Sequence, residues 1–252
     1  MRLPTEGWSQ TIEFRKIFND AEHLPIPCVY VTNTQFTKMI SSINGISTPD
    51  EILQAYTTMF LLLGSSVSDS PEHTGLPSYC HQGLLRQLPV ESNNSRFVSA
   101  SRLLMSPCSH RGSCRTSISG SYHTLFASDD PAEAKPVASA WVSEKVLEMS
   151  DSLAACYQRY SFEKSTCCDL PDDHLGIELL FVNMMIEKYL TEDDVQIKEM
   201  IRRDLLGFIE TNMLPWVTKW SSAVAGRSVT KCYTGIAGLV VGGLEDVRDL
   251  LK

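Results

Sequence analysis

The stretch LPDDHLGIELLFVNMMIEKYL, at 170–190, constrains the fold most, because it joins helix-start signals to an almost entirely apolar helix. Asp172 or Asp173 can cap the free backbone N–H groups of the first turn. Apolar residues then occupy nearly every side of the helix as far as Leu190. A helix that is apolar all round lies inside a fold rather than on its surface. We therefore expect a central, buried helix from Asp172 or Asp173 to Leu190.

A second helix is predicted upstream by the string Thr48-Pro49-Asp50-Glu51. This string offers a hydroxyl for the N-cap, proline at the first helical position and a glutamate three residues after the cap. Apolar residues follow as far as Leu63, and the next residue, Gly64, is of the type that often ends helices. We expect this helix to run from Pro49 to about Leu63.

Helical patterns also occupy the second half of the chain. After the acidic turn SDDPAEAKP we expect a helix that ends near Ser161, with an apolar face made of Trp141, Val142, Val146, Met149, Leu153 and Tyr157. Thr191 and three acidic residues after it predict the start of a long helix, kinked at Pro215. Its core face reads Ile197, Ile201, Leu205, Phe208, Met213, Trp216 and Trp220.

The end of the chain, from Val229 to Leu251, predicts one further helix or two short ones. No alternating strand pattern of useful length follows residue 48. The sequence therefore predicts an all-α protein, a single helical bundle over 48–252.

Two segments lack a clear pattern. Residues 1–47 form a divergent arm of uncertain structure, with a possible short strand at 29–31. The serine-rich stretch at about 91–120 is expected to be a long loop.

Composition narrows the class of protein. A length of 252 residues fits one domain or at most two. The net charge of −8 and pI near 5.3 argue against a general nucleic-acid binder and suit a basic partner.

The opening MRLPTEGWSQTIEFRK lacks an apolar run, so no leader is expected. The longest apolar stretches are shorter than the roughly 20 residues that span a bilayer. We expect a cytoplasmic protein whose eight cysteines are thiols.

The most informative polar residues lie at the start of the central helix. His174 and Glu178 stand four apart and share a face, directly after Asp172 and Asp173. One interpretation is structural: His174 and Glu178 bond each other or a backbone neighbour, and the aspartates cap the helix. The other is a recognition pocket in which Asp173 and Glu178 receive a cation and His174 orients them.

Three motifs resemble those of the TorD/DmsD/NarJ-like chaperones for complex iron–sulfur molybdoenzymes. LPDDHLGIELLFVNMM is similar to the family's Pro-x-Asp-His-x-x-x-Glu-Leu-x-Phe-Met signature, with Pro171, Asp173, His174, Glu178, Leu179 and Phe181 in register and Val182 in place of methionine. FIETNMLPW, at 208–216, resembles Phe-Leu-x-x-His-Leu-x-x-Trp, with Asn212 where histidine is usual. Upstream, the positions that match the family's Tyr-x-x-Leu-Phe and Pro-x-x-Ser-x-Tyr patterns are Tyr122, Leu125, Phe126, Pro136, Ser139 and Trp141.

The resemblance implies an all-helical protein without catalytic activity or cofactor. It implies that the protein binds the twin-arginine leader of an apo-molybdoenzyme and assists its maturation before export. The partner would be a molybdopterin-containing oxidoreductase precursor, bound by a monomer or a domain-swapped dimer. The residues that the resemblance and the chemistry assign to the peptide are Pro171, Asp172, Asp173, His174, Glu178, Tyr122, Phe126, Ser139 and Trp141, with Trp216 and Trp220 as further groove walls.

Other functions remain open. A NarJ-like assembly adaptor would contact the catalytic subunit itself rather than its leader. Cys108, His110 and Cys114, with Cys167 and Cys168, are a candidate thiolate-rich metal site, although no second C-x2-C knuckle matches them. The hypothesis of a cysteine or serine hydrolase has less support, because Cys168 lies near His174 but the sequence has no G-x-S-x-G nucleophile elbow. The sequence also lacks the phosphate-binding loop that a nucleotide hydrolase would need.

Overall fold

The computed structural model describes residues 48–74, 76, 88–105, 111–127, 134–142, 146–164 and 168–252. Every regular element within these ranges is a helix, so the prediction of an all-α fold is confirmed. The divergent arm at 1–47 and its candidate strand at 29–31 lie outside the described residues. No helix in the described ranges is both long enough and apolar enough to cross a membrane.

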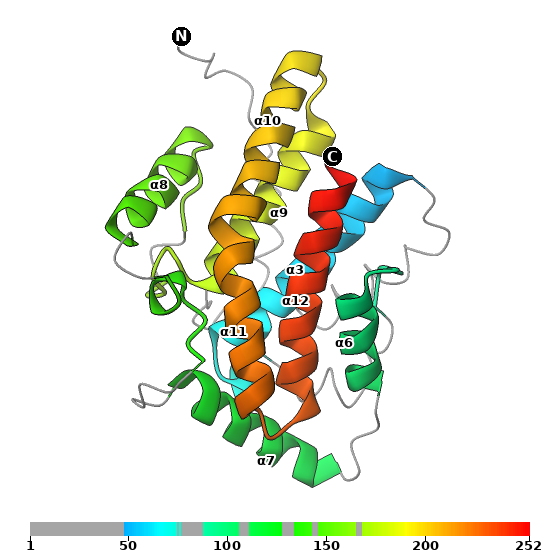
Figure 1. The fold of residues 1–252 in the computed structure, drawn as a ribbon, viewed down its shortest axis with the longest axis vertical. Helices are drawn as coiled ribbons and strands as arrows, with labels where there is room; N and C mark the ends of the chain where they lie inside the picture. The colour runs from blue at the N-terminus through cyan, green and yellow to red at the C-terminus, as the bar shows by residue number, and fades with distance from the viewer. Residues whose placement is uncertain are drawn as a thin grey trace, which may run out of the picture.

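The chain forms a succession of helices of very different lengths. In order they are α3 (Pro49–Ser68), α4 (Pro71–Thr74), α6 (Ser95–Met105), α7 (Arg111–Tyr122), the π-helical turn η2 (His123–Ala127), the 3-10 turn η3 (Ala138–Ala140), α8 (Val146–Arg159), α9 (Leu175–Thr191), α10 (Val195–Gly207), the π-helical turn η4 (Phe208–Met213), α11 (Leu214–Arg227) and α12 (Lys231–Leu250). In Figure 1, α10 and α11 form one column, with α12 beside α11 and α6 on the far side of α12.

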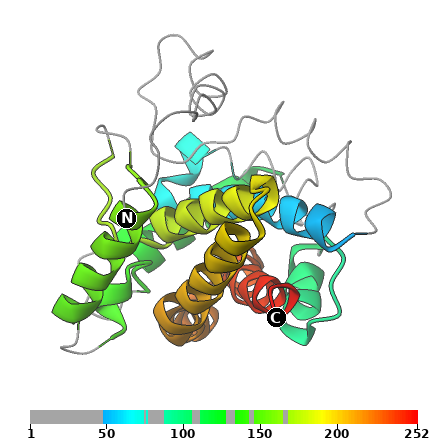
Figure 2. The ribbon, with the colours of Figure 1, turned by 90° about the horizontal axis from the view of Figure 1, so that it is seen from above.

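Two layers of helices enclose the core. Figure 2 shows α3 and α9 together in one layer, with α10, α11 and α12 in the layer below them. The central helix predicted from Asp172 or Asp173 to Leu190 is present as α9, and both of its apolar sides are covered. Its fully buried residues include Leu175, Ile177, Leu179, Phe181, Val182, Met185 and Ile186.

The first described helix extends beyond its expected end. The capping box is present, because the Glu51 N–H donates to the Thr48 hydroxyl at 3.3 Å and the Thr48 N–H donates to the Glu51 carboxylate at 3.0 Å. The prediction that Gly64 ends the helix is wrong, since α3 continues to Ser68. Gly64 instead faces Gly176 of α9, and a Cβ at Gly64 would lie 3.5 Å from the Gly176 Cα. The glycine serves the close approach of two helices.

The prediction of a long serine-rich loop at 91–120 is also wrong, because α6 and most of α7 lie there. Helix α6 buries one narrow face, and it packs against α12 where α12 carries glycines. The buried face consists of Phe97, Ala100 and Leu104, and the facing glycines are Gly235, Gly238 and Gly242. Small residues on α12 therefore let a serine-rich segment with little apolar surface pack as a helix.

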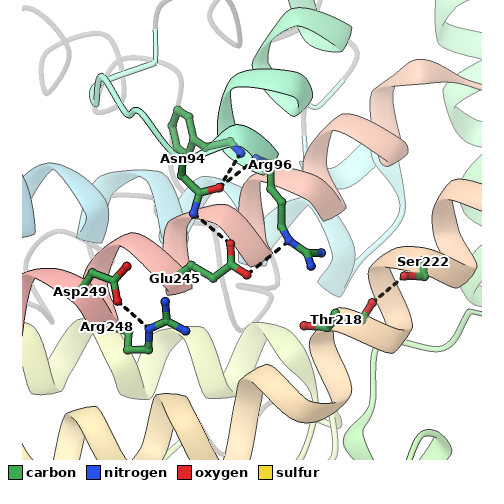
Figure 3. Close-up of polar contacts among 8 residues, drawn as sticks. Asn94, Arg96, Thr218, Ser222, Glu245, Arg248 and Asp249 are labelled. Carbon is green, nitrogen blue, oxygen red and sulfur yellow. Dashed lines mark hydrogen bonds and ion pairs between the residues drawn. The ribbon is translucent and has the colours of Figure 1, made fainter.

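Polar contacts fix the start of α6 on the end of α12. The Asn94 side-chain oxygen accepts the N–H groups of Arg96 and Phe97 at 2.9 and 3.4 Å, and so caps the helix. As Figure 3 shows, the Asn94 amide also donates to Glu245 of α12, at 2.9 Å. The Arg96 guanidinium lies 3.3 Å from the same carboxylate.

Several helix boundaries differ from those expected. Trp141 and Val142 precede α8 instead of belonging to it. Thr191 is the last residue of α9, and Asp194 caps α10 by accepting two backbone N–H groups. The long helix expected there is interrupted by η4, and Pro215 lies in the first turn of α11, directly after the π-helical turn. Residues 231–250 form one helix.

Candidate functional site

The motif LPDDH forms a tight turn that leads into α9. The His174 N–H donates to the Pro171 carbonyl at 3.0 Å, which closes the turn. Helix α9 begins only at Leu175, so the expected start at Asp172 or Asp173 is corrected by two or three residues. The N-cap is His174, whose Nδ1 accepts the Gly176 N–H at 3.1 Å. Both aspartates are therefore left in the turn ahead of the helix.

A second motif segment, residues 134–142, is hydrogen-bonded to this turn. Val137 and His174 form an isolated antiparallel bridge, and the Leu175 N–H donates to the Pro136 carbonyl at 2.8 Å. Asp173 contributes two acceptors: its carbonyl takes the Ala138 N–H at 3.0 Å, and its carboxylate Oδ2 takes the Ser139 N–H at 2.8 Å. Positions predicted from separate motifs thus meet at one place.

Trp141 is held beside the same turn. Its indole N–H donates to the Lys135 carbonyl at 2.8 Å, and its backbone N–H donates to the Ala138 carbonyl at 2.9 Å. The ring is half-buried, whereas Ser139 is exposed. On the turn itself, Pro171 and Asp172 are exposed and Asp173 is half-buried. The turn therefore leaves carboxylate oxygens within reach of solvent, and the segment bonded to it carries the half-buried Trp141.

Glu178 does not belong to this solvent-accessible turn. Its side chain is 0% exposed, and its Oε2 accepts the indole N–H of Trp216, in α11, at 3.2 Å. Burial raises the pKa of the Glu178 carboxyl well above its usual range, and the nearby Asp173 charge adds to this effect, while the Trp216 hydrogen bond opposes it. Burial therefore favours the neutral carboxylic acid over the carboxylate at this position. The expectation that it offers a charge to a cation is not supported by this geometry.

His174 is also buried and neutral. Burial lowers the pKa of its imidazole to about 4, although the Asp173 charge acts in the opposite direction. The ring of His174 bonds the backbone of α9 and not the Glu178 carboxyl. Its position is that of a structural cap, which agrees with the structural interpretation of this residue.

The other aromatic candidates lie in the core at a different place. Tyr122 and Phe126 are half-buried and pack on each other, with ring centroids 5.5 Å apart. Phe126 stacks on Trp220 at 6.3 Å. Among the described residues, no hydrogen bond or ring contact joins Tyr122 or Phe126 to the LPDDH turn. Trp216 and Trp220 are both 0% exposed, so they cannot line an open groove in this conformation.

Two residues that sequence reasoning did not assign to the site also hold the turn. The Tyr157 hydroxyl, from α8, donates to the Asp172 carbonyl at 2.9 Å. The Lys164 ammonium lies 2.7 Å from the Asp172 carboxylate and donates to the Leu170 carbonyl at 2.7 Å. Tyr157 was visible only as an apolar position of its helix, and nothing in the spacing of Lys164 points to the motif.

The cysteines give a mixed result. Cys156 and Cys232 are not in disulfides, whereas Cys168 is buried and disulfide-bonded, which contradicts the expectation for that residue. Of the candidate metal ligands, Cys108, His110 and Cys167 lie outside the described residues. Within the described part of the chain, no three potential metal ligands of the His, Cys, Asp and Glu types lie together. The proposed cysteine site is therefore untested.

Comparison with known proteins agrees with the three motifs. Residues 100–222, which include the LPDDH turn and its bonded segment, match the family model of the nitrate reductase delta subunit. Over 147 residues, the chain is 23% identical to the chaperone protein TorD of Photobacterium profundum, covering 57% of this chain and 68% of that protein. The chain therefore belongs to the nitrate reductase delta subunit family as a distant homologue of TorD, in a family of chaperones rather than enzymes.

Proposed function

We propose that this protein binds the twin-arginine leader of an apo-molybdoenzyme in the cytoplasm and assists its maturation and cofactor insertion before export. The observation that carries the proposal is the pair of consecutive carboxylates, Asp172 and Asp173, held in a fixed turn outside the core. Membership of a chaperone family that includes TorD supports the same activity.

The chemistry of a twin-arginine leader fits this turn. Two guanidinium groups need carboxylate or carbonyl acceptors in fixed positions, because charge-assisted hydrogen bonds to arginine depend strongly on geometry. The apolar part of a leader needs apolar or aromatic surface beside those acceptors. The candidate for such surface is the half-buried Trp141, two residues after Ser139, whose N–H donates to the Asp173 carboxylate.

The structure suggests different roles for the predicted peptide-binding residues. In this proposal Pro171, Asp172, Asp173, Ser139 and Trp141 touch the peptide, because they lie in the solvent-accessible turn or in the segment bonded to it. His174 and Glu178 are positioning residues in the proposal, since one caps α9 and the other ties α9 to α11. Tyr122 and Phe126 remain candidates for a more distant apolar part of the peptide path.

The test is calorimetry of the full chain with a synthetic leader peptide. We expect a Kd on the order of micromolar or tighter. The variant Asp173→Asn keeps an oxygen that can accept the Ser139 N–H, but it removes the charge. It should weaken binding by about tenfold, the order expected when one charge-assisted hydrogen bond is reduced to a neutral one.

A matched control separates local from overall electrostatics. Asp193→Asn makes the same charge change at an exposed position, in the connection between α9 and α10. This variant should bind the leader as the parent does. If the folded Asp173→Asn variant binds as tightly as the parent, the assignment of the turn to the peptide is wrong.

A second candidate is an assembly adaptor that contacts the catalytic subunit itself. The match to the nitrate reductase delta subunit model is the observation that favours it. Capture of a client from which the leader has been deleted distinguishes the two functions. An adaptor retains the leader-deleted client, whereas a leader-binding chaperone loses it.

A further inference from the structure

The acidic turn already holds a cation supplied by the chain itself. The Lys164 ammonium contacts the Asp172 carboxylate Oδ1 at 2.7 Å and donates to the Leu170 carbonyl at 2.7 Å. A carboxylate and a backbone carbonyl together form a small cation-binding subsite. Lys164 therefore reports on how this turn accepts a positive charge.

The segment that carries Lys164 is fixed in place rather than loosely attached. Helix α8 ends at Arg159, and Ser161 then adopts a positive φ of 53°, which reverses the chain. The Phe162 N–H donates back to the Tyr157 carbonyl at 2.8 Å, and the Phe162 ring packs 5.4 Å from Phe181 of α9. This reversal brings the lysine to the turn.

Solvent still reaches both members of the ion pair. The Lys164 side chain is 33% exposed and the Asp172 side chain is 54% exposed. Such exposed pairs contribute little to stability and can be exchanged for another cation. The nearest cation on α8, Arg159, is bound to Asp204 at 2.9 Å and does not share this subsite.

We propose that Lys164 occupies, in the free protein, the cation subsite formed by the Asp172 carboxylate and the Leu170 carbonyl, and that an arginine of the bound leader displaces it. The identity of the ligand rests on the proposed function. A guanidinium presents donors in a rigid fork that can span two acceptors, whereas an ammonium is a point charge. Displacement therefore favours arginine leaders over lysine leaders that would only replace one ammonium by another.

The first experiment measures leader binding by the full-length variant Lys164→Gln. Glutamine can still donate to the Leu170 carbonyl, but it leaves the Asp172 carboxylate without its counter-ion. We expect the twin-arginine peptide to bind about two- to fivefold more tightly, the range that corresponds to releasing one exposed ion pair. The gain should disappear in the double variant Lys164→Gln/Asp172→Asn.

Arg159→Gln is the matched control, because it removes another exposed cation of the same region that is paired with a different carboxylate. It should leave the leader affinity unchanged. An affinity of Lys164→Gln that equals the parent's, or is weaker, overturns the displacement, even when the parent binds the leader well.

A second readout does not depend on the leader. Acetylation of Lys164 by a limiting amine-reactive ester, followed by mass spectrometry, reports whether the ammonium is engaged. Arginine amide whose α-amine is blocked by an acetyl group does not react with the ester, and it should accelerate acetylation of Lys164 in the parent, relative to sodium chloride at the same ionic strength. In Asp172→Asn, Lys164 should react rapidly without any ligand.

These arms separate the two proposals. If arginine amide releases Lys164 but the leader peptide does not bind, the subsite stands and the proposed function fails. If the leader binds and Lys164 keeps its slow rate of acetylation, the subsite is occupied by the lysine throughout and the inference fails. The inference also fails if arginine amide leaves the rate of Lys164 acetylation unchanged.

Discussion

Glu178 carries a carboxyl that is entirely enclosed between α9 and α11. Its Oε2 bonds to Trp216, whereas its Oε1 is buried without a hydrogen-bond partner among the described residues. An ionised carboxylate with one free buried oxygen would be very costly, so the neutral acid is the stable form. Glu178 thus provides a buried hydrogen bond between α9 and α11 instead of a surface charge.

This burial predicts a dependence of stability on pH. The folded-state pKa of Glu178 lies above its unfolded value, so its contribution to stability is complete below about pH 4.5 and is lost as pH rises toward the folded pKa. His174 acts in the opposite sense. Its pKa falls to about 4, so its contribution is complete above its usual value near 6.5 and is lost as pH falls toward 4.

The variant Glu178→Gln isolates the first of these effects. The introduced amide can accept the Trp216 hydrogen bond but does not ionise. Relative to the parent, its free energy of unfolding should rise with pH, by about 1.4 kcal/mol per pH unit while the pH lies between the two pKa values of Glu178. Urea denaturation of both proteins between pH 5 and 8 measures this difference, and the contribution of His174 cancels. Parallel curves would mean that Glu178 titrates alike in the folded and unfolded states.

At the scale of elements, the contact between α6 and α12 depends on glycines. A Cβ at Gly242 would lie 2.8 Å from the backbone nitrogen of Phe97 and 3.0 Å from its Cα. Backbone atoms cannot yield as a flexible side chain does, so α6 would have to move away from α12. Gly226, near the end of α11, is different, since a Cβ there would meet nothing within 4 Å.

The two glycines therefore give opposite predictions for the same substitution. Gly242→Ala should lower the free energy of unfolding by about 1–3 kcal/mol, as overpacking does. Gly226→Ala should be neutral or stabilising by up to about 1 kcal/mol, because alanine favours helix. Thermal or urea denaturation of the two variants measures both values. Equal effects would show that α6 is not pressed against α12 at Phe97.

The same elements show what the sequence can and cannot predict. The capping box at Thr48 and Glu51 was predictable because both of its hydrogen bonds are local. Gly64 was misinterpreted because its role depends on Gly176, which is distant in sequence. Helix α6 was missed because its short apolar face is stable only against the glycines of α12. Local hydrogen bonds could therefore be predicted from the sequence, whereas the close approach of helices that are distant in sequence could not.

The candidate site divides in the same way. The grouping of Asp173, His174 and Ser139 followed from the resemblance of separate motifs to those of one family. The sequence did not show that Asp172 is exposed, Asp173 half-buried and Glu178 fully buried. Helical spacing places Glu178 on the face of His174 but does not indicate what covers that face. The ion pair between Lys164 and Asp172 depends on the chain reversal after α8, and no local sequence pattern predicts that reversal.

At the scale of the whole molecule, one carboxylate of α12 joins segments from opposite ends of the described chain. Asp246 Oδ2 accepts the Tyr56 hydroxyl of α3 and the Ser92 hydroxyl that precedes α6, both at 2.6 Å. The Tyr56 side chain is only 1% exposed, so water does not easily replace its acceptor. Asp246 therefore links α3, α6 and α12 into one structure.

Asp246→Ala should remove this link and destabilise the whole molecule. It leaves the buried Tyr56 hydroxyl without its acceptor, which costs about 1–3 kcal/mol. Asp249→Ala is the matched control three residues away, because Asp249 is 58% exposed and pairs with Arg248 and Lys252. Its loss should cost less than about 1 kcal/mol. In urea, the midpoint should fall clearly for Asp246→Ala with an unchanged slope, since the three helices unfold together. A separate early transition for Asp246→Ala would instead mean that α6 unfolds as an independent unit.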